Sequence, residues 1–265
     1  RNPRDDTYFP VLNEDKAPQA LNTTDDEGYL LDWKTRSVDN LFLENYYIFK
    51  REDDDGGTGI QGQKGIINTF GSFAKYNLSP FTLRGQLAYQ FGEYGNEDRT
   101  GLGGYVYVDE EFKDKTFSPK ASIGYMYLSG DDRGSNKMEA WNPLFSRWPQ
   151  MSELYVLSIA SDSNVGVLGY WTNLSMWRAE LALKLTEKAK LTMWYNFLRA
   201  NELVAGNAVC SGTGKNRGHL PQARFDYAFN KNVSTYCLVE YLIPGNFYKD
   251  RDEALFTRVE LQLKF

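Results

Sequence analysis

A glycine-rich segment, GTGIQG at 57–62, matches the G-x-G-x-x-G pattern of dinucleotide-binding loops. In such loops, glycines let backbone amides approach a pyrophosphate at the start of a helix. Here the segment follows the acidic run REDDD instead of a buried strand, and no helical pattern opens after it. We therefore interpret 57–62 as an exposed loop and predict no nucleotide cofactor.

Residues for acid–base or nucleophilic catalysis are equally sparse. His219 is the only histidine, no G-x-S-x-G segment accompanies it, and a site with several histidine ligands is impossible. The neighbouring carboxylates Glu110 and Glu111 point to opposite faces of a strand, so they cannot act on one bond. The sequence therefore predicts no catalytic residues and a protein that is not an enzyme.

Two acidic runs and two cysteines complete the reactive groups. The runs 53–55 and 131–132 carry the hard oxygen ligands that Ca²⁺ accepts, but neither has EF-hand spacing. Solvated loops are the main interpretation, and Ca²⁺ at these outer loops is the alternative; no other metal or cofactor is predicted. Cys210 falls in an expected outer loop and Cys237 low on a strand, so we do not expect a disulfide between them.

The composition excludes some classes of protein. The 265 residues carry 30 basic and 35 acidic side chains, a net charge of −5, which argues against binding to nucleic acid. No run approaches the ~20 apolar residues of a membrane helix. Aromatic residues make up 15%, with 18 tyrosines. A membrane β-barrel remains possible because only alternate residues face lipid.

The elements that must position any site are long alternating strands. In ALFTRVELQLKF (254–265), Val259 and Leu261 share an apolar face, while Arg258 and Glu260 share the opposite face. About ten such strands are predicted, near 38–50, 64–76, 82–94, 102–113, 118–129, 171–186, 189–202, 219–230, 233–246 and 254–265. Residues 1–37 contain three prolines and no sustained period, so we predict an irregular segment with at most a short strand around GYLLDWK.

Connection lengths alternate along the chain. The short connections are 77–80, 113–117, 187–189 and 231–232, and the long ones are 51–63, 130–170, 203–218 and 244–252. Short periplasmic turns and longer extracellular loops are typical of outer-membrane barrels. We therefore predict an all-β, antiparallel transmembrane β-barrel over residues 38–265, with a long extracellular loop at 130–170. A soluble glycan-binding β-sandwich is the alternative, because its strands also alternate.

The polar face of these strands carries full charges of both signs. Side chains of this kind on neighbouring strands set the field that a solute meets in a lumen. The predicted lumen and selectivity residues are Arg84, Lys120, Arg178, Glu180, Lys184, Arg224, Asp226, Arg258, Glu260 and Lys264. Asp109 and Glu240 add further negative charge. Pairing of these charges across strands, which would stiffen the wall, is the alternative role.

Three segments resemble one known family. SIGYMYLSGDD (122–132), followed by WNPLFSRWPQMSELY (141–155), and LRGQLAYQFGEYG (83–95) resemble the alginate-export family of outer-membrane porins. The resemblance runs from about residue 38 to Phe265 and is most specific at 125–148. It implies a monomeric barrel of about eighteen strands, whose cationic lumen passes an anionic polysaccharide.

The chain departs from this pattern in two respects. About ten strands are fewer than the resemblance implies, so the chain looks like the C-terminal portion of a larger barrel, completed by a missing N-terminal segment or another chain. A closed ten-stranded barrel is the other possibility, with an interior nearly filled by side chains. The lumen is also mixed in charge, which weakens the transfer of alginate itself as the solute.

The long loop gathers aromatic side chains without a helical or strand period. We predict that it folds back into the barrel mouth as a constriction or substrate loop, with Trp141, Phe145, Arg147 and Trp148 as its contact residues. Sugar rings stacking on a tryptophan is the functional hypothesis. The simpler one is that the side chains anchor the loop to the inner wall.

The sequence thus predicts a protein of the bacterial outer membrane that contacts membrane lipid and lipopolysaccharide. Its main predicted function is a passive channel for anionic or neutral oligosaccharides or other small solutes. A structural or plugged barrel subunit of a cell-envelope complex is the first alternative, and the soluble glycan-binding sandwich is the second.

Overall fold

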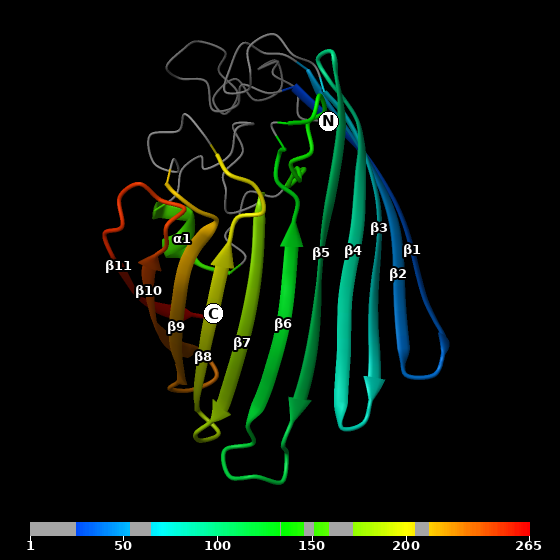
Figure 1. Cartoon of the computed structure of the whole chain (residues 1–265). Coiled ribbons are helices and arrows are strands. Elements are labelled where there is room, and N and C mark those ends of the chain that lie inside the picture. The colour runs from blue at the N-terminus through cyan, green and yellow to red at the C-terminus, as the bar shows by residue number, and fades with distance from the viewer. Residues whose placement is uncertain (1–24, 54–64, 133, 146–150, 159–171, 205–211) are drawn as a thin grey trace.

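The computed structural model describes residues 25–53, 65–132, 134–145, 151–158, 172–204 and 212–265 of the chain. These residues form one antiparallel sheet of eleven strands in sequence order, with one short helix in a connection (Figure 1). The elements are β1 (Asp25–Val38), β2 (Leu41–Asp53), β3 (Gly65–Leu78), β4 (Phe81–Tyr94), β5 (Glu97–Glu111), β6 (Lys120–Leu128), α1 (Glu153–Ser158), β7 (Leu174–Lys184), β8 (Ala189–Arg199), β9 (Asn216–Ala228), β10 (Val233–Pro244) and β11 (Ala254–Leu263).

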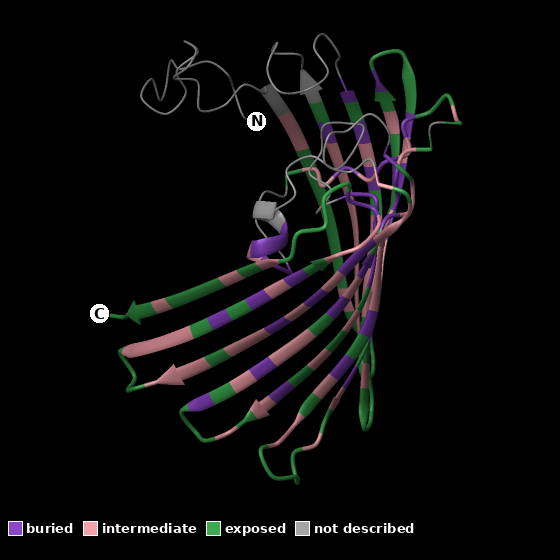
Figure 2. Ribbon diagram, turned by 60° about the vertical axis from the view of Figure 1, so that its left-hand side comes forward, coloured by how far each residue is buried: buried purple, intermediate pink, exposed green. Residues whose placement is uncertain are grey.

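The sheet curves, and its two faces differ in chemistry. Side chains that alternate along each strand place large apolar groups on the convex outer face, where Leu87 is 62% exposed and Val259 75% exposed. The concave inner face carries the polar and charged set, and α1 lies on this side of the sheet (Figure 2). An exposed apolar face of this size is unstable in water and requires an apolar environment.

Phe225 and Leu261 test the sandwich alternative directly. Both lie on the outer face and are substantially exposed, at 40% and 61%. A sandwich would bury them against a second sheet, whereas the described residues form a single sheet. The predicted all-β, antiparallel, barrel-type fold is confirmed, as one open sheet of eleven strands instead of about ten.

The two ends of the sheet have different connections (Figure 1). At one end lie the turns 39–40, 79–80, 112–119, 185–188 and 229–232. At the other end lie 54–64, 95–96, 129–173, 200–215 and 245–253. The predicted strict alternation of short and long fails once, because β4 and β5 join through a two-residue turn in which Gly95 adopts φ 59°.

The short strand considered around GYLLDWK is present and is longer than predicted, so the irregular segment does not extend to residue 37. β1 occupies Asp25–Val38 and pairs with β2 from Asp25↔Asp53 to Val38↔Leu41. The adjacent Leu30 and Leu31 disturbed the alternation in the sequence. In the structure Leu31 points outward with Trp33, while Leu30 lines a hollow on the inner face.

A hydrophobic core fills part of the concave side. Its buried members come from the inner faces of β7–β10, from the loops above them and from α1. They are Met151, Leu154, Tyr155, Leu174, Met176, Leu198, Ala200, Val204, Leu220, Leu242, Phe247 and Tyr248. The prediction of a hydrated lumen is therefore wrong for this part of the inner wall, because the long loop brings its own apolar residues. Across the described residues, no helix has the length and apolar character needed to cross a membrane.

The sheet is open along both sides. Within the described residues, β1 pairs only with β2 and β11 pairs only with β10. Both edge strands start at the end with the long connections and run toward the end with the short turns (Figure 1). The two edges are therefore parallel in direction.

Candidate functional site

The inner wall holds most of the predicted lumen charges. Directly opposed residues in an antiparallel pair lie on one face of a sheet. Arg84 lies opposite Tyr107, Tyr107 opposite Gly124, and Gly124 opposite Arg178. The same register places the following on this face: Lys120, Glu180, Lys184, Arg224, Asp226, Arg258 and Glu260. Lys264 lies one residue beyond β11, where its backbone amide donates to the Asn232 carbonyl.

Arg84 is paired and stacked rather than free. Its Nε donates to Asp109 Oδ2 at 2.7 Å, and its guanidinium lies 4.3 Å from the centroid of the Tyr107 ring. The carboxylate is buried, whereas the arginine keeps a third of its side chain exposed. This arrangement holds the arginine flat on the wall and compensates its charge.

A second unit joins β7 and β8. The Arg178 guanidinium lies 5.4 Å from the Trp194 ring, and Trp194 Nε1 donates to Glu180 Oε2 at 2.9 Å. Arg178 Nη1 also donates to Asn196 Oδ1 at 3.4 Å. The cation and the carboxylate of this unit are thus joined by an aromatic ring between them.

A third unit spans β9, β10 and β11. Arg224 bonds Asp226 at 2.6 Å and lies 4.0 Å from the centroid of the Tyr236 ring. Tyr236 Oη donates to Glu260 Oε2 at 2.9 Å, and Arg258 bonds the same carboxylate at 2.6 Å. These contacts match the alternative role predicted for the charges, in which opposite charges pair along the wall.

Lysines at the short-turn end are less compensated. Lys184 and Lys190 lie directly opposite each other, and like charges in that position repel. They line a hollow of about 810 Å³ together with Lys120, Lys188 and Arg224, and the carboxylates of Glu111, Glu187, Asp226 and Glu260 also line it. Lys184 pairs with Glu187 at 2.9 Å, but Lys120 and Lys190 have no ion-pair partner among the described side chains. We call this hollow the basic hollow.

Residues 141–145 of the long loop lie against the inner wall. Gln90 Nε2 donates to the Asn142 carbonyl at 2.8 Å, and the Asn142 amide donates to Gln90 Oε1 at 2.8 Å. Lys50 Nζ donates to the Leu144 carbonyl at 3.1 Å and lies 5.1 Å from the Phe145 ring centroid. Trp141 lies over Gly103 of β5. Arg147 and Trp148 lie outside the described residues.

A buried carboxylate anchors α1 to the wall. Glu240 is 2% exposed and accepts hydrogen bonds from Ser152 Oγ at 2.8 Å and from the Leu154 amide at 2.7 Å. Gln222 Nε2 donates to its other oxygen at 2.6 Å. A carboxylate at a helix N-terminus satisfies amides that have no partner within the helix.

Two arginines add to this anchor. Arg258 Nη1 bonds both oxygens of Glu153, at 2.7 and 2.9 Å. Arg217 is fully buried; its Nη1 donates to Tyr155 Oη at 2.9 Å, and its guanidinium lies 4.7 Å from the Phe247 ring centroid. The predicted lumen residue Arg258 therefore holds the loop in place.

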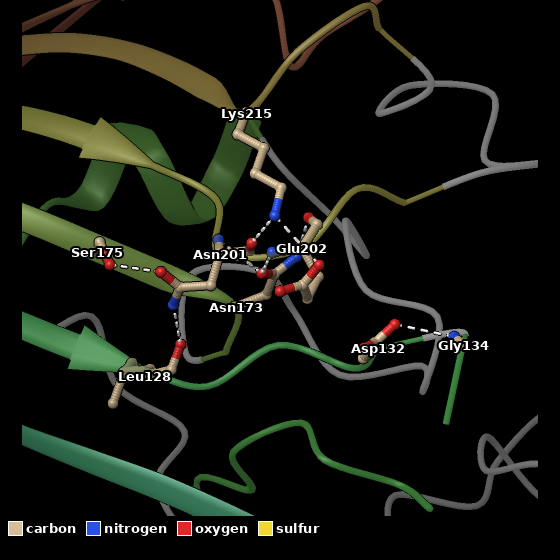
Figure 3. A network of polar contacts seen from close by, with 8 residues as sticks. All are labelled: Leu128, Asp132, Gly134, Asn173, Ser175, Asn201, Glu202 and Lys215. Carbon is tan, nitrogen blue, oxygen red and sulfur yellow. Dashed lines mark hydrogen bonds and ion pairs between the residues drawn. The ribbon is translucent and has the colours of Figure 1, made fainter. Parts of the chain in front are cut away.

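A polar network ties the loop-side ends of the strands together (Figure 3). Asn173, with φ 53°, accepts from the amides of Asn201 and Glu202 at 2.9 and 2.7 Å. Asn201 Nδ2 reaches the Leu128 carbonyl, and Lys215 bonds Glu202 Oε2 at 3.1 Å. The ends of β6, β7, β8 and β9 are thus held as one unit, which fixes where the long loop leaves and returns.

The residues that were considered for catalysis, His219, Glu110 and Glu111, do not lie together in one site. His219 lies on the outer face, where its Nδ1 is 2.7 Å from Tyr195 Oη. Glu110 lies opposite Phe81 on the outer face and Glu111 opposite Lys120 on the inner face, as predicted. Cys237 is exposed, unpaired and on the outer face, and Cys210 lies outside the described residues.

The carboxylates of the acidic run 131–132 accept hydrogen bonds from backbone amides of the same loop. Asp131 accepts from the Glu139 amide at 3.0 Å, and Asp132 accepts from the Gly134 amide at 2.8 Å (Figure 3). Among the described residues, no three metal-ligating side chains come together. The side chains of 53–55 lie outside the described part, so Ca²⁺ binding there stays a prediction.

An antiparallel meander with an apolar convex face and a charged concave face is the wall of an outer-membrane β-barrel. The alginate export family matches residues 6–262, nearly the whole chain. The chain belongs to this family and is a channel-type protein of the bacterial outer membrane. The comparison with curated proteins found no match.

Several solved outer-membrane proteins are similar in fold. The NanC porin is 13% identical, with a TM-score of 0.39 over 91% of this chain and 99% of that one. OccK5 (OpdH) of Pseudomonas aeruginosa is 12% identical, with a TM-score of 0.43 over 92% and 73%. Outer membrane phospholipase A of Escherichia coli is 11% identical, with a TM-score of 0.36 over 90% and 77%.

The sequence analysis did not predict some of the side chains that line the inner wall. Tyr46 and Tyr107 point inward but were not among the predicted lumen residues. Glycines within strands were the available signal, because a strand glycine often marks close approach of another group. Gly71 lies under Tyr46 and Gly103 under Trp141.

Proposed function

We propose that the protein is a passive outer-membrane channel for oligosaccharides and similar small solutes, without covalent chemistry. The observation that carries this proposal is the separation of the two faces: apolar side chains cover the convex side, and charged rows cover the concave side. A polar inner wall offers hydrogen bonds and charge to a hydrated solute, while the outer face contacts lipid and lipopolysaccharide.

The basic hollow is the strongest candidate for a selectivity element. Lys120 and Lys190 are exposed and form no ion pair among the described side chains, although Glu111 and Asp226 lie opposite them in the sheet. We propose that these two ammonium groups attract anions to this end of the inner wall. The three Arg–ring units contribute less, because each arginine already lies against a ring and near a carboxylate. We propose that the lysines, more than the arginines, set the charge preference.

Conductance in planar bilayers tests this function. Replacing Lys120, Lys184 and Lys190 together with Gln should move the reversal potential in a salt gradient toward cation preference. Lys113→Gln, in a turn at the same end of the sheet, is the matched control and should leave the potential unchanged. A conducting protein whose potential is the same with and without the three lysines would contradict the assignment.

A plugged barrel is the second candidate, and the core around α1 favours it. Twelve buried residues occupy the inner side of β7–β10, where water would otherwise stand. If the protein inserts into bilayers but carries no current, the plugged alternative replaces the channel.

We also propose that the open edges are completed by strands from outside the described residues. Unpaired backbone groups are not tolerated in the hydrocarbon region, so both β1 and β11 need partners. The two edge strands run in the same direction, so an all-antiparallel closure needs an odd number of further strands. About seven would give the eighteen implied by the family resemblance.

A further inference from the structure

A second hollow lies on the inner wall, apart from the basic hollow, and shares no lining residue with it. It measures about 490 Å³, a size typical of small-molecule sites. The inner faces of β1–β6 form its sides, and loop residues 141, 143 and 144 border it. We call it the aromatic hollow, after Tyr46, Tyr105 and Trp141 in its lining.

Two of its rings lie flat on strand backbones. A Cβ added to Gly71 would stand 2.1 Å from Tyr46 Cζ, and a Cβ added to Gly103 would stand 2.7 Å from Trp141 Cδ2. Only glycine allows such close approach, so each ring rests against the wall with one face. Both side chains remain partly exposed, so the other ring faces are accessible from the hollow.

These two rings differ from the other aromatic residues of the inner wall. Tyr107, Trp194 and Tyr236 each have an arginine over the ring. Among the described residues, neither Tyr46 nor Trp141 has a cation or another ring against it. Their π faces are therefore available to a ligand.

Polar groups around the hollow suit hydroxyls better than anions. Lys34 Nζ lies 2.8 Å from Asp32 and 3.5 Å from Glu44, so two carboxylates surround one ammonium group. Gln86 Nε2 donates to Tyr46 Oη, which fixes the phenol beside them. The local charge is negative, so a polyanion is repelled, while carboxylate oxygens accept hydrogen bonds from neutral hydroxyls.

We propose that the aromatic hollow binds a neutral pyranose unit of an oligosaccharide, with its C–H face on Tyr46 and Trp141 and its hydroxyls on Asp32, Lys34 and Glu44. This rests on the proposed channel function and narrows its solute. The apolar C–H face of a sugar ring carries slight positive charge and matches the negative face of an aromatic ring. The ion-paired side chains supply both donors and acceptors.

The test is calorimetric titration of the full chain, purified in detergent, with maltotriose as the neutral probe and trigalacturonate as the anionic probe. Wild-type protein should bind maltotriose more tightly than trigalacturonate. Tyr46→Leu and Trp141→Leu keep apolar bulk but remove the ring, and each should weaken maltotriose binding by about tenfold. Trp177→Leu, which removes an exposed ring from the outer face, is the control and should change nothing.

Each outcome is decisive when every variant also shows the heat-modifiable gel migration of a folded barrel. Tighter trigalacturonate binding that is insensitive to Trp141→Leu would assign sugar binding to the basic hollow and overturn the proposal. Conducting protein that binds neither probe would also overturn it while leaving the channel intact. If wild-type protein carries no current in planar bilayers, the channel function itself is rejected.

Discussion

At the scale of single residues, the inner wall combines charges that are neutralised with charges that are not. Arg84, Arg224 and Arg258 bond carboxylates, so each adds little net field. Glu240 is buried and satisfied by three donors, which makes it a structural carboxylate. Charges with this degree of pairing stiffen a wall, which is why the proposed selectivity rests on the exposed lysines.

Glu240→Gln should loosen the long loop. Glutamine is neutral, and its NH2 group would face hydrogen-bond donors that now bond the Glu240 carboxylate. We expect the loss of these charge-assisted hydrogen bonds to lower the stability of the loop by about 2 kcal/mol. Faster limited proteolysis within residues 129–173 is the expected result. Glu139→Gln, in the same loop, should leave the cleavage rate at the wild-type value, and equal rates for both variants would contradict the anchoring role.

The carboxylates of the aromatic hollow should control which sugars enter it. Asp32→Asn combined with Glu44→Gln removes two negative charges next to Lys34 and leaves a net positive site. We expect the affinity for trigalacturonate to rise relative to maltotriose in the same titration. Glu111→Gln, on the inner face at the short-turn end, is the matched control, and an equal change there would show a general field effect.

At the scale of elements, α1 is a short helix held on the inner wall by its apolar side. Leu154 and Tyr155 are buried in the core that it shares with β7–β10, and Glu153 pairs with Arg258 of β11. The element therefore narrows the interior along these strands. If the protein is the proposed channel, its solute would pass along β1–β6, where the aromatic hollow lies.

Leu154→Asp should release α1 and increase conductance. Leu154 is 6% exposed, and a carboxylate in that core has no hydrogen-bond partner, so the packed arrangement is lost. Single-channel recording should give a larger current per channel than wild type. Leu154→Met keeps an apolar side chain in the core and leaves the Glu153–Arg258 pair intact, so it should change the current little. If Leu154→Asp conducts like wild type, α1 does not obstruct the pore.

The alternation of apolar and polar residues predicted the strands of the wall and the face on which almost every lumen charge lies. This was possible because successive side chains of a strand point to opposite faces, a pattern that one sequence displays directly. Only a short strand was considered at β1, because the adjacent Leu30 and Leu31 break the alternation, although Leu31 faces outward and Leu30 inward. The ring contacts of Tyr46 and the burial of Arg217 depend on segments far apart in the chain. No local pattern records such contacts, so the aromatic hollow was not predictable.

At the scale of the whole molecule, the described strands form a curved wall whose edges, β1 and β11, have no partner within the described part of the chain. β1 and β11 run in the same direction, so a second copy inserted the same way would meet either edge with a parallel strand. Antiparallel closure therefore requires other strands, in odd number. Homo-oligomerisation through these edges is not an equivalent solution.

Disulfide trapping can check the closure. Cysteines placed singly at Leu31 on β1 or Leu255 on β11, with Cys210 and Cys237 replaced by Ser, should not form a homodimer in membranes under oxidising conditions. Thr257, on the outer face within the same edge strand, is a suitable second position. An efficient homodimer through either edge would contradict the requirement for other strands.

The most direct test of the account is the accessibility of spin labels on adjacent residues in membrane-embedded protein. Labels at Phe225 and Leu261, on the outer face, should collide with oxygen dissolved in the acyl region, and labels at Asp226 and Gln262, on the inner face, with a water-soluble nickel chelate. The predicted result is an alternation that switches at every residue. Oxygen accessibility at Asp226 and Gln262, with Phe225 and Leu261 shielded from oxygen, would contradict it.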